Sequence, residues 1–165
     1  MSGNQNAEQP SRARLYSIEV DEKSLARNSA NVEHEREVAI FDLLDGNSFD
    51  VVGREDGPFR LVISLVEQRL QLAIGTNAEP EVVTHQLSMT PFKRIIKDYF
   101  MMCDSYYEAI RTAPPAKIQA IDQGRRGLHD EGSRLLMERL DGKVNVDFDT
   151  ARRLFTLISA LHWKG

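Results

Sequence analysis

Apolar residues in the first half of the chain fall at every second position, which is the pattern of strands that bury one face. The alternation is clearest over residues 59–66 (FRLVISLV) and 69–74 (RLQLAI), which the short link Glu67-Gln68 separates. Two alternating segments joined by two residues predict a β-hairpin. Weaker alternation predicts three further strands, over residues 16–20, 49–51 and 83–87.

Between the first two of these strands, residues 33–45 have helical spacing. Glutamates in the first turn suit the positive end of a helix dipole, and Gly46 stands where a helix stops. The predicted apolar stripe of this helix consists of Val38, Ile40, Phe41 and Leu44. The helix therefore interrupts a half of the chain that is otherwise rich in strands.

The second half of the chain has the three-and-four spacing of amphipathic helices. Thr90-Pro91 predicts the start of a long helix, and Pro114-Pro115 predicts its end. A short extended link over residues 143–148 precedes the last helix, for which Asp149 or Thr150 is the expected cap. That helix runs to about residue 163.

Residues 115–140 also keep helical spacing, but Gly124, Gly127 and Gly132 interrupt it. Each glycine inside a helix costs about 1 kcal/mol relative to alanine. The segment is therefore either one helix that packs very closely at its glycines or two helices with a break near residues 124–127.

Together these elements predict an α+β fold, in which a small antiparallel sheet from the N-terminal half packs against a C-terminal bundle of three to four helices. Each half has one apolar face, so each must cover the other. We expect residues 1–11, which are almost entirely polar or small, to form a disordered tail. Residues 12–165 are then a single domain.

Charge and cysteine content narrow the binding partners and the cellular compartment that we expect for the protein. The net charge is −4, and residues 1–58 carry 12 acidic and 6 basic side chains. Residues 114–165 carry 9 basic and 7 acidic side chains, an excess too small to favour nucleic-acid binding. No apolar run is long enough to cross a membrane. With one cysteine, Cys103, no internal disulfide can form, and we expect a cytoplasmic protein.

The densest group of polar residues is GRRGLHDEGS, residues 124–133. The candidate ligand-binding residues within it are Arg125, Arg126, His129, Asp130 and Glu131. Two arginines could clamp a phosphate or a carboxylate, and a histidine could transfer a proton near neutral pH. The alternative is a solvated turn of helix whose charges pair with each other, as Arg126 and Asp130 would at i,i+4.

Other familiar motifs are absent or incomplete. The segment DGKVNVDFD (141–149) resembles a calcium loop, but Lys143 and Val146 occupy positions that require an oxygen ligand and a glycine. The four histidines are scattered, which predicts no metal site, and no cofactor motif is present. Cys103 lies on the apolar stripe of its helix, so we expect a buried, unreactive thiol.

Several long blocks resemble the uncharacterised alphaproteobacterial protein family UPF0262. They are VEHEREVAIFDLL (32–44), PFKRIIKDYF (91–100), AIDQGRRGLHDEGS (120–133) and DFDTARRLFTLISALHW (147–163). The resemblance covers nearly the whole chain from about Arg14 onward. It implies a bacterial, cytoplasmic, single-domain protein. Because the family carries no known function, no catalytic or binding residue is transferred from it.

Three functional hypotheses follow. The first is a non-enzymatic regulatory or interaction module that binds a protein partner or associates with itself as a homodimer. The second is a protein or enzyme for a small anion, in which Arg125 and Arg126 hold the anion, His129 transfers a proton and Asp130 or Glu131 orients it. The third and weakest is RNA binding by the basic C-terminal third.

Overall fold

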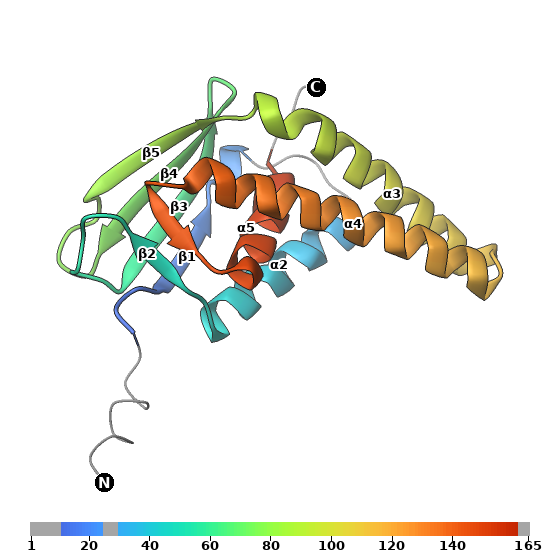
Figure 1. Cartoon of the computed structure of the whole chain (residues 1–165), viewed down its shortest axis with the longest axis horizontal. Helices are drawn as coiled ribbons and strands as arrows, with labels where there is room; N and C mark the ends of the chain where they lie inside the picture. Colours follow the sequence, from blue (N-terminus) through green and yellow to red (C-terminus); the bar gives the residue numbers. More distant parts are fainter. Residues whose placement is uncertain (1–10, 25–29, 162–165) are drawn as a thin grey trace, which may run out of the picture.

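The computed structural model describes residues 11–24 and 30–161 of the chain. A sheet lies at one end of the molecule, helices cover one of its faces, and a helical hairpin extends away from it (Figure 1). The strands are β1 (Leu15–Val20), β2 (Phe49–Val51), β3 (Phe59–Val66), β4 (Arg69–Thr76), β5 (Val83–Ser88) and β6 (Val144–Val146). The α-helices are α2 (Ala30–Asp45), α3 (Lys93–Thr112), α4 (Pro115–Leu140) and α5 (Phe148–Ser159), and short 3₁₀ turns span Glu22–Ser24 and Thr90–Phe92.

The main sheet has the strand order β1-β3-β4-β5. Strands β3 and β4 form the expected hairpin, with Glu67 and Gln68 in its turn, both at positive φ (51° and 63°). Positive φ at both turn residues matches the right-handed twist of the two strands. Strand β5 adds to β4 in antiparallel fashion, with Leu72 opposite His85.

The first strand departs from the expected antiparallel sheet. β1 runs parallel to β3, with Val20 opposite Ile63, so the sheet is mixed. A parallel pair requires a long connection that returns the chain to its starting edge, and α2 lies within that connection. The α+β class is confirmed, whereas the all-antiparallel sheet is wrong for β1.

The two short strands β2 and β6 pair with each other rather than with the main sheet. Their antiparallel ladder places Phe49 opposite Val146 and Val51 opposite Val144. Backbone bonds tie this ladder to the rest of the fold, since Phe49 N donates to Ala13 O at 2.9 Å. The ladder joins segments almost a hundred residues apart, and so it holds α5 close to α2.

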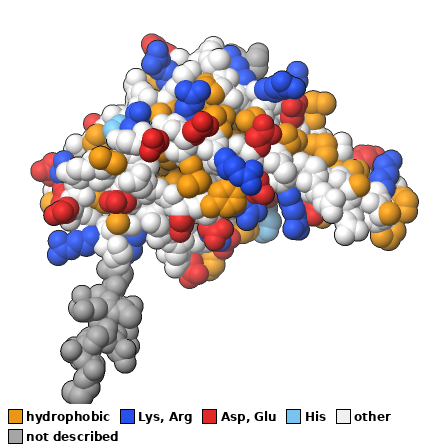
Figure 2. Space-filling model, viewed as in Figure 1, with side chains coloured by type: hydrophobic (Ala, Val, Ile, Leu, Met, Phe, Trp, Pro, Cys, Tyr) orange, Lys and Arg blue, Asp and Glu red, His pale blue; other side chains and the backbone are white. Residues whose placement is uncertain are grey.

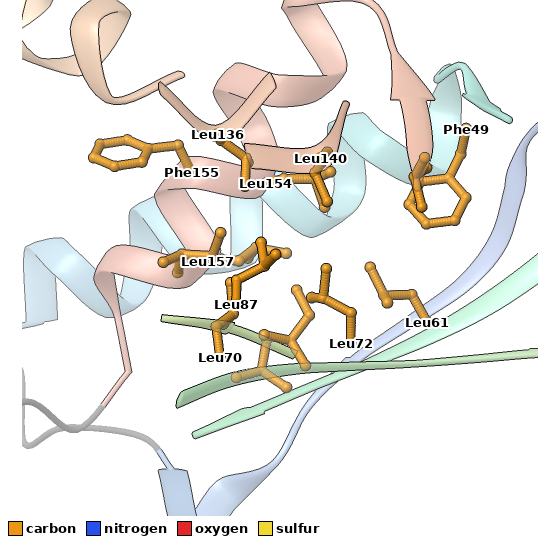
Figure 3. Close-up of a cluster of buried hydrophobic side chains, with 14 of the residues drawn as sticks. Phe49, Leu61, Leu70, Leu72, Leu87, Leu136, Leu140, Leu154, Phe155 and Leu157 are labelled. Carbon is orange, nitrogen blue, oxygen red and sulfur yellow. The ribbon is translucent and has the colours of Figure 1, made fainter. Parts of the chain in front are cut away.

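The core lies between the main sheet and the helices α4 and α5. Figure 3 shows Leu61, Leu70, Leu72 and Leu87 of the sheet directed toward leucines of the two helices. On the helical side these are Leu136, Leu140, Leu154 and Leu157, all buried. The predicted alternation is confirmed, because every second residue of β3 from Phe59 to Ile63 is buried.

Residues 115–140 form one uninterrupted helix, α4, which packs against α3 as a helical hairpin. A Cβ at Gly132 would overlap the ring of Phe155, and a Cβ at Gly124 would meet the end of the Met102 side chain. Nothing lies near the Cβ position of Gly127. Of the two alternatives from the sequence, the single helix that packs very closely at a glycine is therefore the one observed, and the close packing is at Gly132.

Two local predictions are wrong. The cap of α5 is Asp147, whose Oδ1 accepts from the backbone N of Thr150 at 2.8 Å, because β6 ends one residue earlier. The predicted stripe of α2 is largely exposed, since the buried residues of the described helix are Ala39 and Leu43. Phe41 is 71% exposed. Apolar residues surround much of α2, so spacing alone could not identify its buried side.

Two predictions concern the ends of the chain. The tail over residues 1–11 lies outside the described residues except for Ser11. The last helix, α5, ends at Ser159, earlier than the predicted end near residue 163. None of the described helices is long and apolar enough to span a membrane. On the face shown in Figure 2, basic and acidic side chains are intermixed, with apolar side chains between them.

Candidate functional site

A cleft of about 600 Å³ lies between α2, α4 and α5. Tyr99 of α3 contributes to its wall. The other lining residues are His34, Glu35, Val38, Ala39 and Asp42 of α2, Arg125, Arg126 and His129 of α4, and Asp149, Arg152, Arg153 and Thr156 of α5. Three of the five candidate residues, Arg125, Arg126 and His129, therefore converge on one cleft.

Arg125 is the most enclosed of the cleft arginines, with 19% of its side chain exposed. Its Nη2 and Nε donate to Asp122 Oδ1 at 2.7 and 3.2 Å, and its Nη1 contacts Glu35 Oε1 at 3.5 Å. The guanidinium also lies over the ring of Tyr106, 4.4 Å from the centroid. With two acids and an aromatic ring around it, Arg125 holds α4 to α2 and α3.

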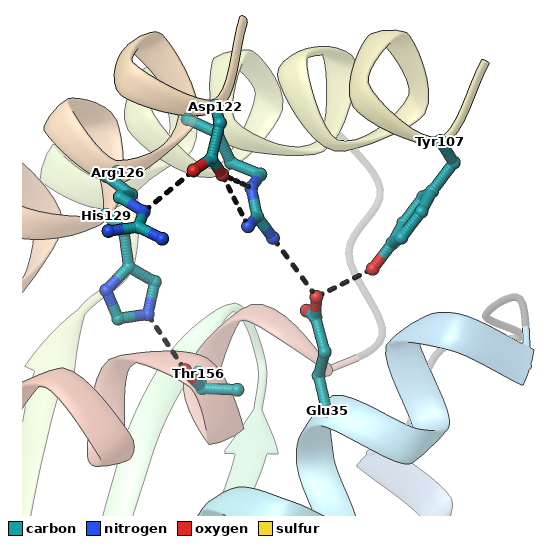
Figure 4. A network of polar contacts seen from close by, with 7 residues as sticks. Glu35, Tyr107, Asp122, Arg126, His129 and Thr156 are labelled. Carbon is teal, nitrogen blue, oxygen red and sulfur yellow. Dashed lines mark hydrogen bonds and ion pairs between the residues drawn. The ribbon is translucent and has the colours of Figure 1, made fainter. Parts of the chain in front are cut away.

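Glu35 completes this network from α2 (Figure 4). The hydroxyl of Tyr107 donates to Glu35 Oε1 at 2.7 Å. Burial, followed by the hydrogen bond to Glu35, raises the pKa of Tyr107 above its ordinary value. The network thus joins three helices through one carboxylate. No motif in the sequence singles out Glu35, which precedes Arg125 by 90 residues.

Cys103 of α3 is buried, as expected. Burial raises the pKa of its thiol to about 11. Burial also raises the pKa of neighbouring Tyr99 above its ordinary value. Both groups are therefore protonated at neutral pH, and the thiol has little nucleophilic character.

His129 contacts α5 from the wall of the cleft (Figure 4). Its Nε2 lies 2.8 Å from Thr156 Oγ1, and the Thr156 hydroxyl lies 3.2 Å from Arg152 O. The hydroxyl can donate its single proton to only one of these two acceptors, so the direction of the His129–Thr156 hydrogen bond follows the imidazole tautomer. The imidazole also packs against the rings of Tyr99 and Phe155, each with centroids 5.3 Å away.

The environment of His129 keeps its imidazole neutral. Burial, followed by the nearby charge of Arg152, lowers its pKa to about 4. Its Nδ1 is buried and has no hydrogen-bond partner among the described residues. At neutral pH His129 is thus an uncharged residue that connects α4 to α5, and its burial disfavours the proton-transfer role suggested from the sequence.

The remaining cleft arginines are more accessible. Arg126 is 70% exposed, and its Nε lies 3.0 Å from Asp122 Oδ2. Arg152 Nε lies 3.4 Å from Asp130 Oδ1, and Arg153 Nε lies 3.8 Å from Asp42 Oδ2. In each pair the nearest nitrogen is Nε, and Arg153 Nη1 also donates to the backbone oxygen of Asp149 at 3.5 Å. The terminal nitrogens of Arg126 and Arg152 are therefore the ones placed to donate to a ligand.

The pairing expected within the glycine-flanked cluster is wrong. Arg126 pairs with Asp122, one turn before it, rather than with Asp130. Asp130 instead contacts Arg152 of α5, since it lies on the side of α4 that meets that helix. Neither Asp130 nor Glu131 lines the cleft, and Glu131 is exposed.

The family model described as "Uncharacterised protein family (UPF0262)" matches residues 12–164, nearly the full length of the chain. The chain belongs to this family. A relative named UPF0262 protein from Nitrobacter winogradskyi is 59% identical over 165 residues, which cover 100% of this chain and 99% of the relative. Another, from Rhizobium meliloti, is 58% identical over 152 residues, covering 92% and 96%. No solved structure matches.

Membership of UPF0262 confirms the resemblance seen in the sequence but assigns no role to a residue, because the relatives carry only the family name.

The cleft itself contains several residues that sequence reasoning missed. Glu35 and Asp42 come from α2, and Arg152, Arg153 and Thr156 come from α5. The adjacent arginines of α5 were visible in the sequence, but only the packing of α5 against α4 places them beside Arg126.

Proposed function

We propose that this UPF0262 protein is a non-enzymatic binding module whose cleft takes a small anion, a phosphate or a carboxylate. The observation that supports this most is the convergence of arginines from two helices, α4 and α5, on one cleft of about 600 Å³. A guanidinium donates two parallel hydrogen bonds to either anion. The cleft volume lies within the range typical of small-molecule sites.

The arginines divide into two roles in this proposal. Arg126 and Arg152 contact the anion, because their terminal nitrogens are not the atoms that face Asp122 and Asp130. Arg125 is a positioning residue, since Asp122, Glu35 and the Tyr106 ring already surround its guanidinium. The ligand-contacting set is therefore shifted toward α5 relative to the set chosen from the sequence.

The state of His129 supports binding rather than catalysis. A general acid or base works best with a pKa near the operating pH, and the pKa of His129 is about 4. Its Nε2 is already engaged with the hydroxyl of Thr156. His129 thus supports the wall of the cleft.

Thermal denaturation with inorganic phosphate and with a dicarboxylate tests this function. We expect either anion to raise the Tm in a saturable manner, and Arg126→Met to abolish the rise while leaving the Tm without ligand nearly unchanged. Arg139→Met is the matched control, because Arg139 is exposed on the same helix and lies outside the cleft lining. A Tm that no anion shifts, or a shift that Arg139→Met removes equally, would contradict the proposal.

A second candidate function, interaction with a protein, has support from the exposed side of α2. Val38, Phe41 and Leu44 are 42%, 71% and 46% exposed and follow one another at three-residue spacing. Val38 also lines the cleft, so this apolar side borders the site. Exposed apolar patches of this kind commonly mark interaction surfaces. The candidate includes self-association as a homodimer in the cytoplasm, where the free thiol of Cys103 would stay reduced.

Light scattering across a concentration series tests the self-association. We expect Phe41→Ser to lower the fraction of dimer, whereas Met101→Ser should not, although Met101 of α3 is also 58% exposed. Equal mass for the wild type and both variants, corresponding to one chain, would exclude a homodimer through α2.

A further inference from the structure

The two edges of the main sheet differ in how they are covered. At β1, the Asn47 side chain accepts from Leu15 N at 2.7 Å and donates to Leu15 O at 3.0 Å, and Phe49 N donates to Ala13 O just before the strand. β5 forms the other edge (Figure 1), and no described residue hydrogen-bonds with its outer backbone. β5 also lacks the charged residues and proline with which natural proteins protect an exposed edge.

The direction of the backbone groups along β5 follows from the hairpin before it. Val66 and Arg69 flank the two-residue turn and lie opposite each other, so their N–H and C=O groups bond to one another. Because these groups alternate in direction along a strand, those of Leu72 face β5, where they meet His85. By the same alternation, the residues whose N–H and C=O groups face away from β4 are Thr84, Gln86 and Ser88.

Two hydroxyl groups at this edge also have unused hydrogen-bonding capacity. Thr84 Oγ1 is buried and has no partner among the described residues. Ser88 Oγ accepts from Thr90 N at 3.2 Å, which leaves the proton of its hydroxyl to be donated. The side chains of Thr84 and Ser88 lie on the same side of the strand, because they are four residues apart. The edge therefore offers both backbone and side-chain groups to a neighbouring strand.

We infer that β5 pairs with β5 of a second copy of this chain, across a two-fold axis at Gln86. In this antiparallel pair Gln86 lies opposite Gln86 of the second copy, and Thr84 lies opposite its Ser88. Every outward N–H and C=O of these residues then has a partner, and the Thr84 and Ser88 hydroxyls face each other. Any other register pairs fewer of these groups. The two four-stranded sheets become one continuous sheet, with the helices of both copies on the same face.

The charges around β5 support a second copy as the partner. The strand itself is uncharged at neutral pH, since burial and then nearby Lys143 lower the pKa of His85. Exposed Glu81 precedes the strand, whereas Arg69 lies opposite Ser88 at its other end and exposed Arg94 follows. A two-fold axis brings the acidic end of each strand toward the basic end of the other, and opposite charges attract.

This interface is distinct from the exposed side of α2. Helix α2 contacts β1, at the opposite edge of the sheet from β5. Pairing through β5 therefore leaves Val38, Phe41 and Leu44 exposed for a different protein, and it does not depend on the anion site. Variants on β5 and on α2 can thus be compared directly.

Light scattering and amide hydrogen exchange of the full chain, over a concentration series into the millimolar range, test the interface. We expect a dimer to form as the concentration rises, and the amides of Thr84 and Ser88 to exchange about tenfold more slowly in it. Gln86→Pro should abolish the dimer and this protection, because it removes the central donor at an edge position where proline is tolerated. Gln86→Thr is the matched control, since it keeps that N–H, and it should still form the dimer.

A second variant covers the case in which Gln86→Pro fails to fold, as judged by circular dichroism. Gln86→Lys places two like charges opposite each other at the axis and should weaken the dimer about tenfold. Its control is Gln71→Lys, which adds the same charge on the same side of the sheet, one strand further from the edge.

Several results would overturn the inference. One is a mass of one chain at every concentration, and another is a dimer that the folded Gln86 variants leave intact. A dimer that Phe41→Ser dissociates, while the Thr84 and Ser88 amides exchange equally fast at all concentrations, would place the contact at α2 and exclude β5.

Discussion

The two halves of α4 have different surroundings although they form one continuous helix. All four buried residues of the helix, Gly132, Ser133, Leu136 and Leu140, lie in its second half, residues 132–140. The first half, residues 115–131, extends beyond the sheet beside α3 and carries Arg125, Arg126 and His129 at the cleft (Figure 1). The core therefore fixes the direction of the helix, and the polar half positions side chains that contribute little to the core.

The largest difference between the halves is expected at their glycines. Gly132→Ala should lower the free energy of unfolding by about 2–3 kcal/mol, because its Cβ would overlap the Phe155 ring in a packed core. Gly127→Ala should raise it by about 1 kcal/mol, since its Cβ would meet nothing and alanine favours the helix. Urea denaturation of both variants measures the two effects. Equal effects would show that the halves do not differ in packing.

The same glycines show how far the sequence determines this fold. The strands, the helices and the α+β class followed from the spacing of apolar residues, because one buried face imposes a period of two or of 3.6. Spacing could not decide whether α4 was one helix, since that depends on what lies against Gly132. It also could not show that β1 is parallel to β3, because strand direction depends on the path of the chain between them.

The candidate site was predictable only in part, for a similar reason. Arg125, Arg126 and His129 stood out because they are close together in the sequence. Glu35 and Asp42 could not be found in that way, since they come from α2 and reach the cleft only through the packing of three helices. Asp130 and Glu131 were selected for proximity in sequence, but the turn of the helix directs them away from the cleft lining.

The second prediction compares two adjacent arginines in the polar half. Arg125→Met should lower the free energy of unfolding by about 2 kcal/mol, because partly buried Glu35 and Asp122 lose the guanidinium between them and keep only Tyr107 and Arg126 as partners. Arg126→Met should change it by less than about 0.5 kcal/mol, since Arg126 is exposed and its ion pair is screened by solvent. We expect Arg126→Met to lose more affinity for the anion than Arg125→Met does. Chemical denaturation measures the stability of both variants, and calorimetry measures their anion binding. Equal losses of stability in the two variants would contradict the division of roles.

The third prediction concerns the pH dependence contributed by His129. In the folded chain its pKa is about 4, whereas an unfolded histidine has a pKa near 6.5. The unfolded state therefore takes up a proton first, so stability from this residue is present above about pH 6.5 and is lost as the pH falls toward 4. The charged groups that shift its pKa are Arg152, Asp130 and Arg125.

Between pH 7.5 and 5 this linkage should lower the free energy of unfolding by roughly 1–2 kcal/mol. His129→Gln does not titrate and should show a flatter profile over that range. Urea denaturation at several pH values measures the difference. Parallel profiles for the wild type and the variant would show that the pKa of His129 is not depressed.

The smallest effect is expected at the contact that joins the polar half to α2. Tyr107→Phe removes only the hydroxyl that donates to Glu35 at 2.7 Å, and should lower the free energy of unfolding by about 1 kcal/mol. Tyr106→Phe is the matched control, because it keeps the ring beneath Arg125 and the Tyr106 hydroxyl bonds to no described residue. Since Glu35 also contacts Arg125, the loss in Tyr107→Phe should largely disappear in an Arg125→Met background if the three groups act as one network. Strict additivity of the two substitutions in a double-mutant cycle would mean that Tyr107 and Arg125 hold α2 independently.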